Sequence, residues 1–198
     1  MRTIGVVLFD QFELLDVFGP LEMFGMLPEE FAIRLVSEQA DEIASRQGPA
    51  SVIEHYASDG HDYDMLLVPG GQGTRREVQN QPLLHWLVKA SAHAEVVASV
   101  CTGSALLARA GLLDGRRATT NKLAFDWVAG QGANVSWQRR ARWVEDGKFW
   151  TSSGVSAGTD MALALIARLC GIVQAREVAH WAEYVWNEDS GNDPFAVA

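Results

Sequence analysis

The residue with the clearest chemical signature is Cys101, which follows the apolar run 95–100 and precedes Thr102-Gly103-Ser104. A buried strand that turns abruptly into a helix lifts the side chain at the turn above the sheet and strains its backbone. The unpaired N–H groups at the start of that helix favour a thiolate over a thiol. Cys101 is therefore predicted to be a nucleophile. The alternative is a small apolar side chain in the core, a role that also suits Cys170.

A second signal is the glycine pair Gly70 and Gly71, which follows the short apolar run 65–68. Glycine lets backbone N–H groups approach a ligand closely, as an oxyanion hole requires. The amide of Thr102, directly after the candidate nucleophile, would supply a second donor. The same residues are also consistent with an ordinary turn. A phosphate-binding loop is disfavoured because no Gly-Lys-Ser/Thr element follows.

The third candidate is Asp16, which lies between apolar neighbours just before Gly19-Pro20. If this carboxyl is buried near a thiolate, desolvation and like charge raise its pKa and keep it protonated. It could then donate a proton to sulfur or to a substrate. A carboxylate that satisfies backbone N–H groups at a helix N-terminus explains the spacing equally well.

The histidines show no pattern that pairs them with a strand end. All five lie in polar or surface-helix contexts and are expected to be solvated: His55, His61, His85, His93 and His180. No group of His, Cys and Asp has a familiar metal-ligand spacing, so the sequence predicts no metal site.

Apolar runs that alternate with helical patterns indicate the architecture that positions these residues. Strands are expected over 3–9, 31–36, 65–68 and 95–100, with a weaker hint at Val52-Ile53 and a hairpin turn at Asp146-Gly147. Helices are expected from Pro20, over 80–94, directly after Cys101, over 159–169 and over 173–187. This alternation predicts an α/β fold with a mostly parallel sheet sandwiched by helices, of the flavodoxin-like kind.

In such sheets ligands bind beyond the carboxyl ends of the strands. This rule brings together the loop after Phe9, the loop at Gly70 and Gly71, and Cys101. We expect a single domain over residues 1–189, since no repeat or linker interrupts it, and a loose tail over 190–198.

Composition narrows the possible partners and the compartment. The chain has 198 residues and a formal net charge of −9, so nucleic acid and anionic membrane surfaces are disfavoured as partners. No apolar run reaches the 18 or so residues that a spanning helix needs. The two cysteines and the lack of an export signal favour a reduced, cytoplasmic protein.

Five motifs together resemble the ThiJ/PfpI superfamily, whose fold is similar to that of class I glutamine amidotransferases. They are Asp16 before Gly19-Pro20, the motif 68–71 (VPGG), the motif 99–104 (SVCTGS), the motif 117–120 (RATT) and the motif 154–160 (GVSAGTD). The CTGS form resembles the isocyanide hydratase branch. The resemblance covers residues 4–169 and implies a homodimer that needs no cofactor.

By this resemblance Cys101 is the nucleophile, Asp16 its acidic partner and Thr102 a hydroxyl neighbour, with oxyanion-type amides from Gly71 and Thr102. Many relatives carry His where this chain has Asn121. That difference disfavours amide hydrolysis, because expulsion of an amine needs a proton donor of suitable pKa.

The resulting prediction is hydration of an isocyanide to an N-formamide through a thioimidate on the cysteine. The pocket walls are expected to be apolar, with Phe12, Leu15 and Val155 as candidates. Two other functions fit the same residues. One is a glyoxalase-like conversion of methylglyoxal to lactate. The other is a non-catalytic ligand or redox sensor, since the domain also resembles the N-terminal module of some AraC-type regulators.

Overall fold

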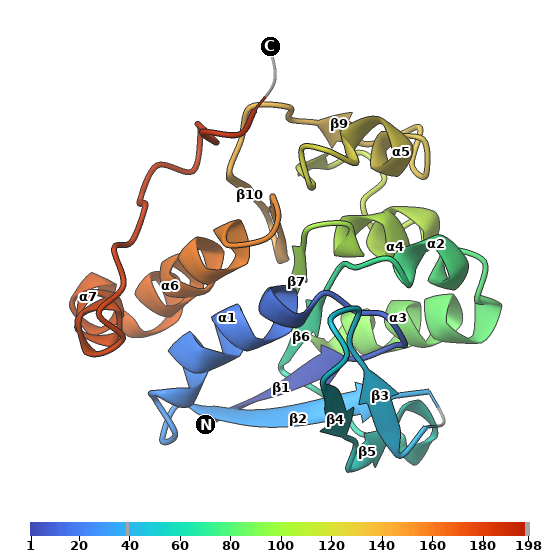
Figure 1. Cartoon of the computed structure of the whole chain (residues 1–198), viewed down its shortest axis with the longest axis horizontal. Coiled ribbons are helices and arrows are strands. Elements are labelled where there is room, and N and C mark those ends of the chain that lie inside the picture. Colours follow the sequence, from blue (N-terminus) through green and yellow to red (C-terminus); the bar gives the residue numbers. More distant parts are fainter. Residues whose placement is uncertain (39, 197–198) are drawn as a thin grey trace.

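The computed structural model describes residues 1–38 and 40–196. One seven-stranded sheet forms the centre of the molecule (Figure 1). Across the sheet the strands are β10 (Trp143–Asp146), β11 (Phe149–Ser152), β7 (Val96–Val100), β6 (Met65–Val68), β1 (Arg2–Val7), β2 (Phe31–Ser37) and β5 (His55–Tyr56). All neighbours are parallel except β10 and β11, which form an antiparallel hairpin.

Helices cover both faces of this sheet, as the alternating pattern predicts. They are α1 (Leu14–Gly25), α2 (Thr74–Glu77), α3 (Gln81–His93), α4 (Gly103–Arg109), α5 (Phe125–Ala129), α6 (Ala157–Cys170) and α7 (Ile172–Trp181). In Figure 1, α1, α6 and α7 lie on one side of the sheet, and α2, α3 and α4 lie on the other. The central strands β6 and β7 are buried at every residue, so their two faces form the core between these layers.

Three small elements complete the chain. A two-stranded antiparallel sheet joins β3 (Glu42–Ala44) to β4 (Ala50–Val52), next to the weak strand expected at Val52-Ile53. A second pair joins β8 (Arg117–Ala118) to β9 (Ser136–Trp137), and a 3-10 turn, η1, spans Ala57–Asp59. Among the described residues no helix is both long enough and apolar enough to cross a membrane.

Helix α1 begins earlier than the sequence predicts. Pro20 was expected at the first helical position, but it lies inside a helix that starts at Leu14. The buried side chains Val17, Leu21 and Phe24 form one apolar stripe along this helix. Their burial outweighs the loss of the proline N–H, so the helix continues through Pro20. This earlier start places Asp16 in the first turn of the helix.

Helix α7 ends at Trp181, before the limit of 187 expected from its amphipathic pattern. Glu183 adopts a left-handed φ of 50°, which interrupts the helix. The chain that follows is held by Asp160 of α6. Tyr184 Oη and the amide of Asn187 donate to Asp160 Oδ1 at 3.1 and 2.9 Å. These contacts between distant residues, rather than local helix propensity, determine the path of the chain.

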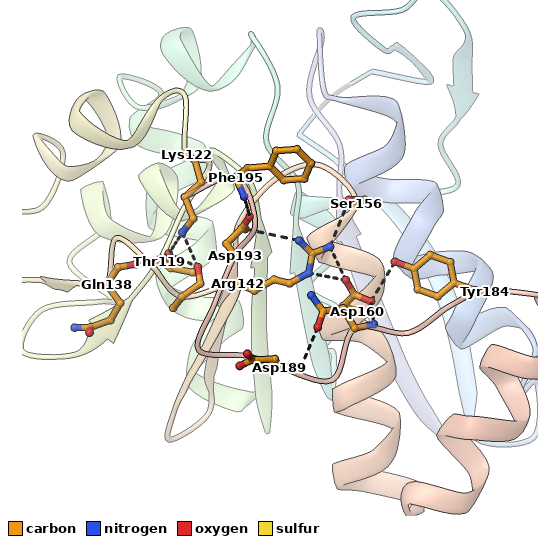
Figure 2. A network of polar contacts seen from close by, with 12 residues as sticks. Thr119, Lys122, Gln138, Arg142, Ser156, Asp160, Tyr184, Asp189, Asp193 and Phe195 are labelled. Carbon is orange, nitrogen blue, oxygen red and sulfur yellow. Dashed lines mark hydrogen bonds and ion pairs between the residues drawn. The ribbon is translucent and has the colours of Figure 1, made fainter. Parts of the chain in front are cut away.

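The chain beyond Ser190, expected to be a loose tail, is fixed to the body of the molecule as far as residue 196. The Arg142 amide donates to the Ser190 carbonyl at 2.8 Å, and the Asp193 amide donates to the Arg140 carbonyl at 2.7 Å. Figure 2 shows the buried Arg142 guanidinium between Asp160 and Asp193. The carboxylate of Asp193 lies 3.8 Å from Arg142 Nη1, and Asp193 is only 2% exposed. Residues 197–198 of the expected tail lie outside the described part.

Candidate active site

Cys101 lies at the sharp junction between β7 and α4, as predicted. Its φ is 57°, a left-handed value that an L residue adopts only under constraint. Its amide is shared between the carbonyls of Ser152 and Ser153, at 3.2 and 3.3 Å. Gly103 makes the turn possible, because a Cβ there would lie 2.2 Å from the Val68 carbonyl oxygen. The backbone of three strands therefore holds the thiol above the sheet.

Asp16 reaches the same place from α1 and is fully buried. Its Oδ2 accepts a hydrogen bond from the Gly70 amide at 2.9 Å, while its Oδ1 has no hydrogen-bond partner within the described chain. Burial raises the pKa of Asp16 well above its ordinary value, and the Gly70 hydrogen bond opposes this only in part. Burial therefore favours the protonated form of this carboxyl, as expected for an acid that is buried near Cys101.

Gly70 is the residue that allows this approach. A Cβ on Gly70 would lie 2.5 Å from the Thr102 nitrogen and 2.8 Å from Asp16 Oδ2. Any side chain there would separate the carboxyl from the turn that carries Cys101. Gly70 thus positions the acid through its own N–H and through its missing side chain.

The electrostatics of Cys101 differ from those predicted by the helix argument. Burial is the largest influence and raises the pKa of the Cys101 thiol, and the Asp16 charge adds to it. The Thr102 amide and the Asn121 side chain act in the opposite direction through hydrogen bonds to the sulfur. Helix α4 has only seven residues, so its dipole does not outweigh burial. Burial thus favours the neutral form of both the thiol and the carboxyl.

Asn121 is a site residue that the sequence marked only as a departure from a resemblance. Its Oδ1 accepts a hydrogen bond from the Ala124 amide at 2.9 Å, which turns the Nδ2 group toward the thiol. Gly154 packs against both groups, since a Cβ there would lie 2.6 Å from Cys101 Sγ and 2.7 Å from Asn121 Nδ2. The side-chain hydrogen bonds that act on the pKa of the Cys101 thiol are those of Asn121 and Asp16.

Thr102 and Gly71 are brought together, but they bond to each other. The Gly71 amide donates to Thr102 Oγ1 at 3.1 Å, and the hydroxyl of Thr74 donates to the same atom at 3.1 Å. Gly71 has a φ of 121°, and a Cβ there would lie 2.4 Å from the Glu13 nitrogen. The Gly71 amide is thus within the site, and a substrate atom has to compete with the Thr102 hydroxyl for it.

The three residues expected to form apolar walls differ in exposure. Phe12 is fully buried and pairs through its backbone with Gly71, so it supports the loop and does not face an opening. Leu15 is 47% exposed, and Val155 is half-buried beside Gly154. Leu15 and Val155 therefore remain the candidates for contact with a substrate.

Comparisons with known proteins identify the family and the fold. A family model described as the DJ-1/PfpI family matches residues 2–168. An isonitrile hydratase from Pseudomonas putida is 35% identical and covers 91% of this chain and 78% of its own length. A ThiJ/PfpI family protein from Pseudomonas syringae has a crystal structure that superposes with a TM-score of 0.86 at 31% identity, covering 98% of this chain and 77% of that one.

A regulator is also similar over a shorter range. The HTH-type transcriptional regulator CdhR from Pseudomonas aeruginosa is 36% identical over 59% of this chain and 34% of its own length. The same fold thus occurs in relatives named as enzymes and in relatives named as regulators.

Proposed function

Because the chain belongs to the DJ-1/PfpI family, we propose that it is a cysteine-dependent hydratase that adds water to an isocyanide and releases an N-formamide. The observation that carries this proposal is the fully buried carboxyl of Asp16, whose pKa burial raises, beside the thiol of Cys101. Similarity to the isonitrile hydratase from Pseudomonas putida supports the choice of substrate class.

In the first step Cys101 Sγ forms a bond to the terminal carbon of the isocyanide. The same carbon takes a proton from the Asp16 carboxyl, and the thiol proton passes to the carboxyl. The product is a thioimidate, R–N=CH–S–Cys, and Asp16 is neutral again. A carboxyl that burial keeps protonated can perform this exchange without charge separation.

In the second step water adds to the thioimidate carbon. Asp16 accepts a proton from the water and gives its own proton to the imine nitrogen. The C–S bond then breaks, the hydroxyl becomes the formamide carbonyl, and its proton returns to sulfur. The balance is one isocyanide and one water in, and one R–NH–CHO out, with the thiol and the acid restored.

The amide groups around the sulfur have a supporting part. The Thr102 amide and Asn121 Nδ2 donate hydrogen bonds to the sulfur. They stabilise negative charge on Sγ while the C–S bond forms and again while it breaks. This arrangement suits addition of water to an electrophilic carbon, whereas expulsion of an amine would require a stronger proton donor than Asn121 provides.

The experiment that tests the proposal is hydration of p-nitrophenyl isocyanide by the Cys101→Ala variant. We expect no turnover, because the covalent intermediate cannot form. Cys170→Ala removes the other thiol and is the matched control, with an expected rate equal to that of the wild type. An unchanged rate in Cys101→Ala would exclude covalent catalysis by this residue.

The similarity to CdhR favours one other candidate, a sensor that responds through Cys101 without turnover. Peroxide would then convert the thiol to a sulfinate, which adds two oxygen atoms. Intact mass after mild peroxide, measured beside the isocyanide assay, distinguishes the two functions. An enzyme hydrates the isocyanide before oxidation, and a sensor shows only the change in mass.

A further inference from the structure

A group of metal-ligating side chains lies away from Cys101, on the edge strand β5 and the segment that follows it. His55, Asp59 and His61 offer one ligand atom each, and these atoms lie within 4.8 Å of one another. The 3-10 turn η1 and Gly60, with a left-handed φ of 70°, reverse the chain. This turn returns His61 to His55, so that their rings are 5.4 Å apart at an interplanar angle of 81°.

We propose that His55, Asp59 and His61 bind a divalent transition metal ion, with Zn²⁺ as the representative ion. Two imidazoles and one carboxylate form a common ligand set for Zn²⁺, and such three-ligand sites leave a fourth position for water. The sequence predicted no metal site because no familiar ligand spacing is present. The three ligands come together only through the turn.

The backbone already holds two of these ligands in place. His55 pairs with Val36 of β2, which fixes the backbone that carries one imidazole to the edge of the sheet. The Tyr56 amide donates to Asp59 Oδ2 at 2.8 Å, which orients the carboxylate and leaves Oδ1 for a metal. Tetrahedral Zn²⁺ with bonds of about 2.1 Å needs ligand atoms about 3.4 Å apart. The ligand atoms lie within 4.8 Å of one another and therefore have to move closer together. Because Asp59 and His61 are exposed, rotation of their side chains can bring these atoms to the required separation.

The surroundings of the site distinguish it from the cysteine site. β5 is at the edge of the sheet, and β6, β1 and β2 separate it from β7, which carries Cys101. On the side of α3, His61 also lines a cavity of about 410 Å³ with Asp62, His85 and His93. His93 Nδ1 lies 3.5 Å from Asp62 Oδ1. These two residues line the same cavity as His61 and are therefore a second candidate pair of metal ligands.

The test is titration of the full chain with ZnCl₂ by calorimetry, after treatment with EDTA. We expect one Zn²⁺ per chain. His61→Ala and His55→Ala should each weaken binding at least tenfold, and Asp59→Asn should weaken it by a similar factor. His180→Ala, which removes an exposed histidine on α7, is the matched control and should change the affinity less than twofold.

A second measurement identifies the ligands without activity. The Co²⁺ complex should show d–d absorption but no thiolate-to-metal charge-transfer band, because neither cysteine lies in the site. His61 is exposed, so its replacement leaves folding intact, and an unchanged melting temperature in EDTA verifies this. The proposal is overturned by the absence of stoichiometric binding in the wild type, by full affinity in a His55→Ala/His61→Ala double variant, or by a thiolate band. Loss of affinity in His93→Ala with His61→Ala unaffected would assign the ion to the neighbouring pair and also overturn it.

Discussion

Replacement of Gly154 by alanine is expected to disable the site while the fold survives. The new Cβ would lie 2.6 Å from Cys101 Sγ and 2.8 Å from Cys101 Cβ. Non-bonded carbon atoms prefer separations of about 3.5–4.0 Å, so one partner has to move by about 1 Å. A displacement of about 1 Å at a reacting atom can lower a rate ~100-fold.

The same overpacking also has a cost in stability. An added methyl group in a packed interior destabilises by about 1–3 kcal/mol. For a chain of this length each kcal/mol lowers the melting temperature by about 2–4 °C. Gly154→Ala should therefore remain folded at 25 °C, with a melting temperature lower by a few degrees and a kcat/KM for p-nitrophenyl isocyanide reduced ~100-fold.

Gly25→Ala is the matched control, because its new Cβ would meet only Ile33 Cδ1 at 3.8 Å, an ordinary contact. Gly25 is the last residue of α1, where alanine is the better helix former by up to about 1 kcal/mol. We expect unchanged kcat/KM and an equal or higher melting temperature. If Gly154→Ala keeps the wild-type kcat/KM, then Gly154 does not press on the nucleophile and the steric reasoning is refuted.

Three further predictions concern the buried acids. Asp16→Asn should lower kcat about 10²–10⁴-fold, the contribution of a general acid, and a wild-type rate would remove Asp16 from the mechanism. Because burial raises the pKa of Asp16 in the folded state, its contribution to stability is present at low pH and is lost as pH rises toward that pKa. The free energy of unfolding of Asp16→Asn in urea should therefore exceed that of the wild type at pH 7, and the difference should shrink toward pH 4. A difference that does not change with pH would contradict the raised pKa of Asp16. Asp160→Ala leaves the buried Arg142 without its partner at 2.7 Å and should lower the free energy of unfolding by about 3–5 kcal/mol. Arg168→Ala removes an exposed ion pair with Glu145 at 3.9 Å and should lower the free energy of unfolding by less than about 1 kcal/mol. Equal losses of stability in thermal melts would refute the difference between the buried and the exposed pair.

The sequence was sufficient to predict the central sheet and the cysteine turn. The apolar runs that became β6 and β7 are buried on both faces, so composition alone identifies them. Parallel strands bring their carboxyl ends to one edge of a sheet, and this rule predicts that the glycine pair lies near Cys101. Only Gly fits at position 103, but this steric requirement is visible only in the structure, where a Cβ would meet the Val68 carbonyl oxygen.

Other features depend on contacts between distant residues. The path beyond Trp181 follows hydrogen bonds to Asp160, which no local pattern reveals. Asn121 faces the thiol because the Ala124 amide fixes its amide group. The direction of the Cys101 pKa also escaped local reasoning, because burial outweighs the short helix that follows.

The pairing of β7 with β11 has a consequence for biosynthesis. The amide of Cys101 finds its acceptors, the Ser152 and Ser153 carbonyls, only when β11 has docked, and Gly154 follows directly. Since the ribosome delivers the N-terminal strands first, a nascent chain carries this sulfur uncovered until the later segment emerges. Fragments that stop before Phe149 therefore contain Cys101 but lack the two carbonyls that accept its amide and the Gly154 that packs against its thiol.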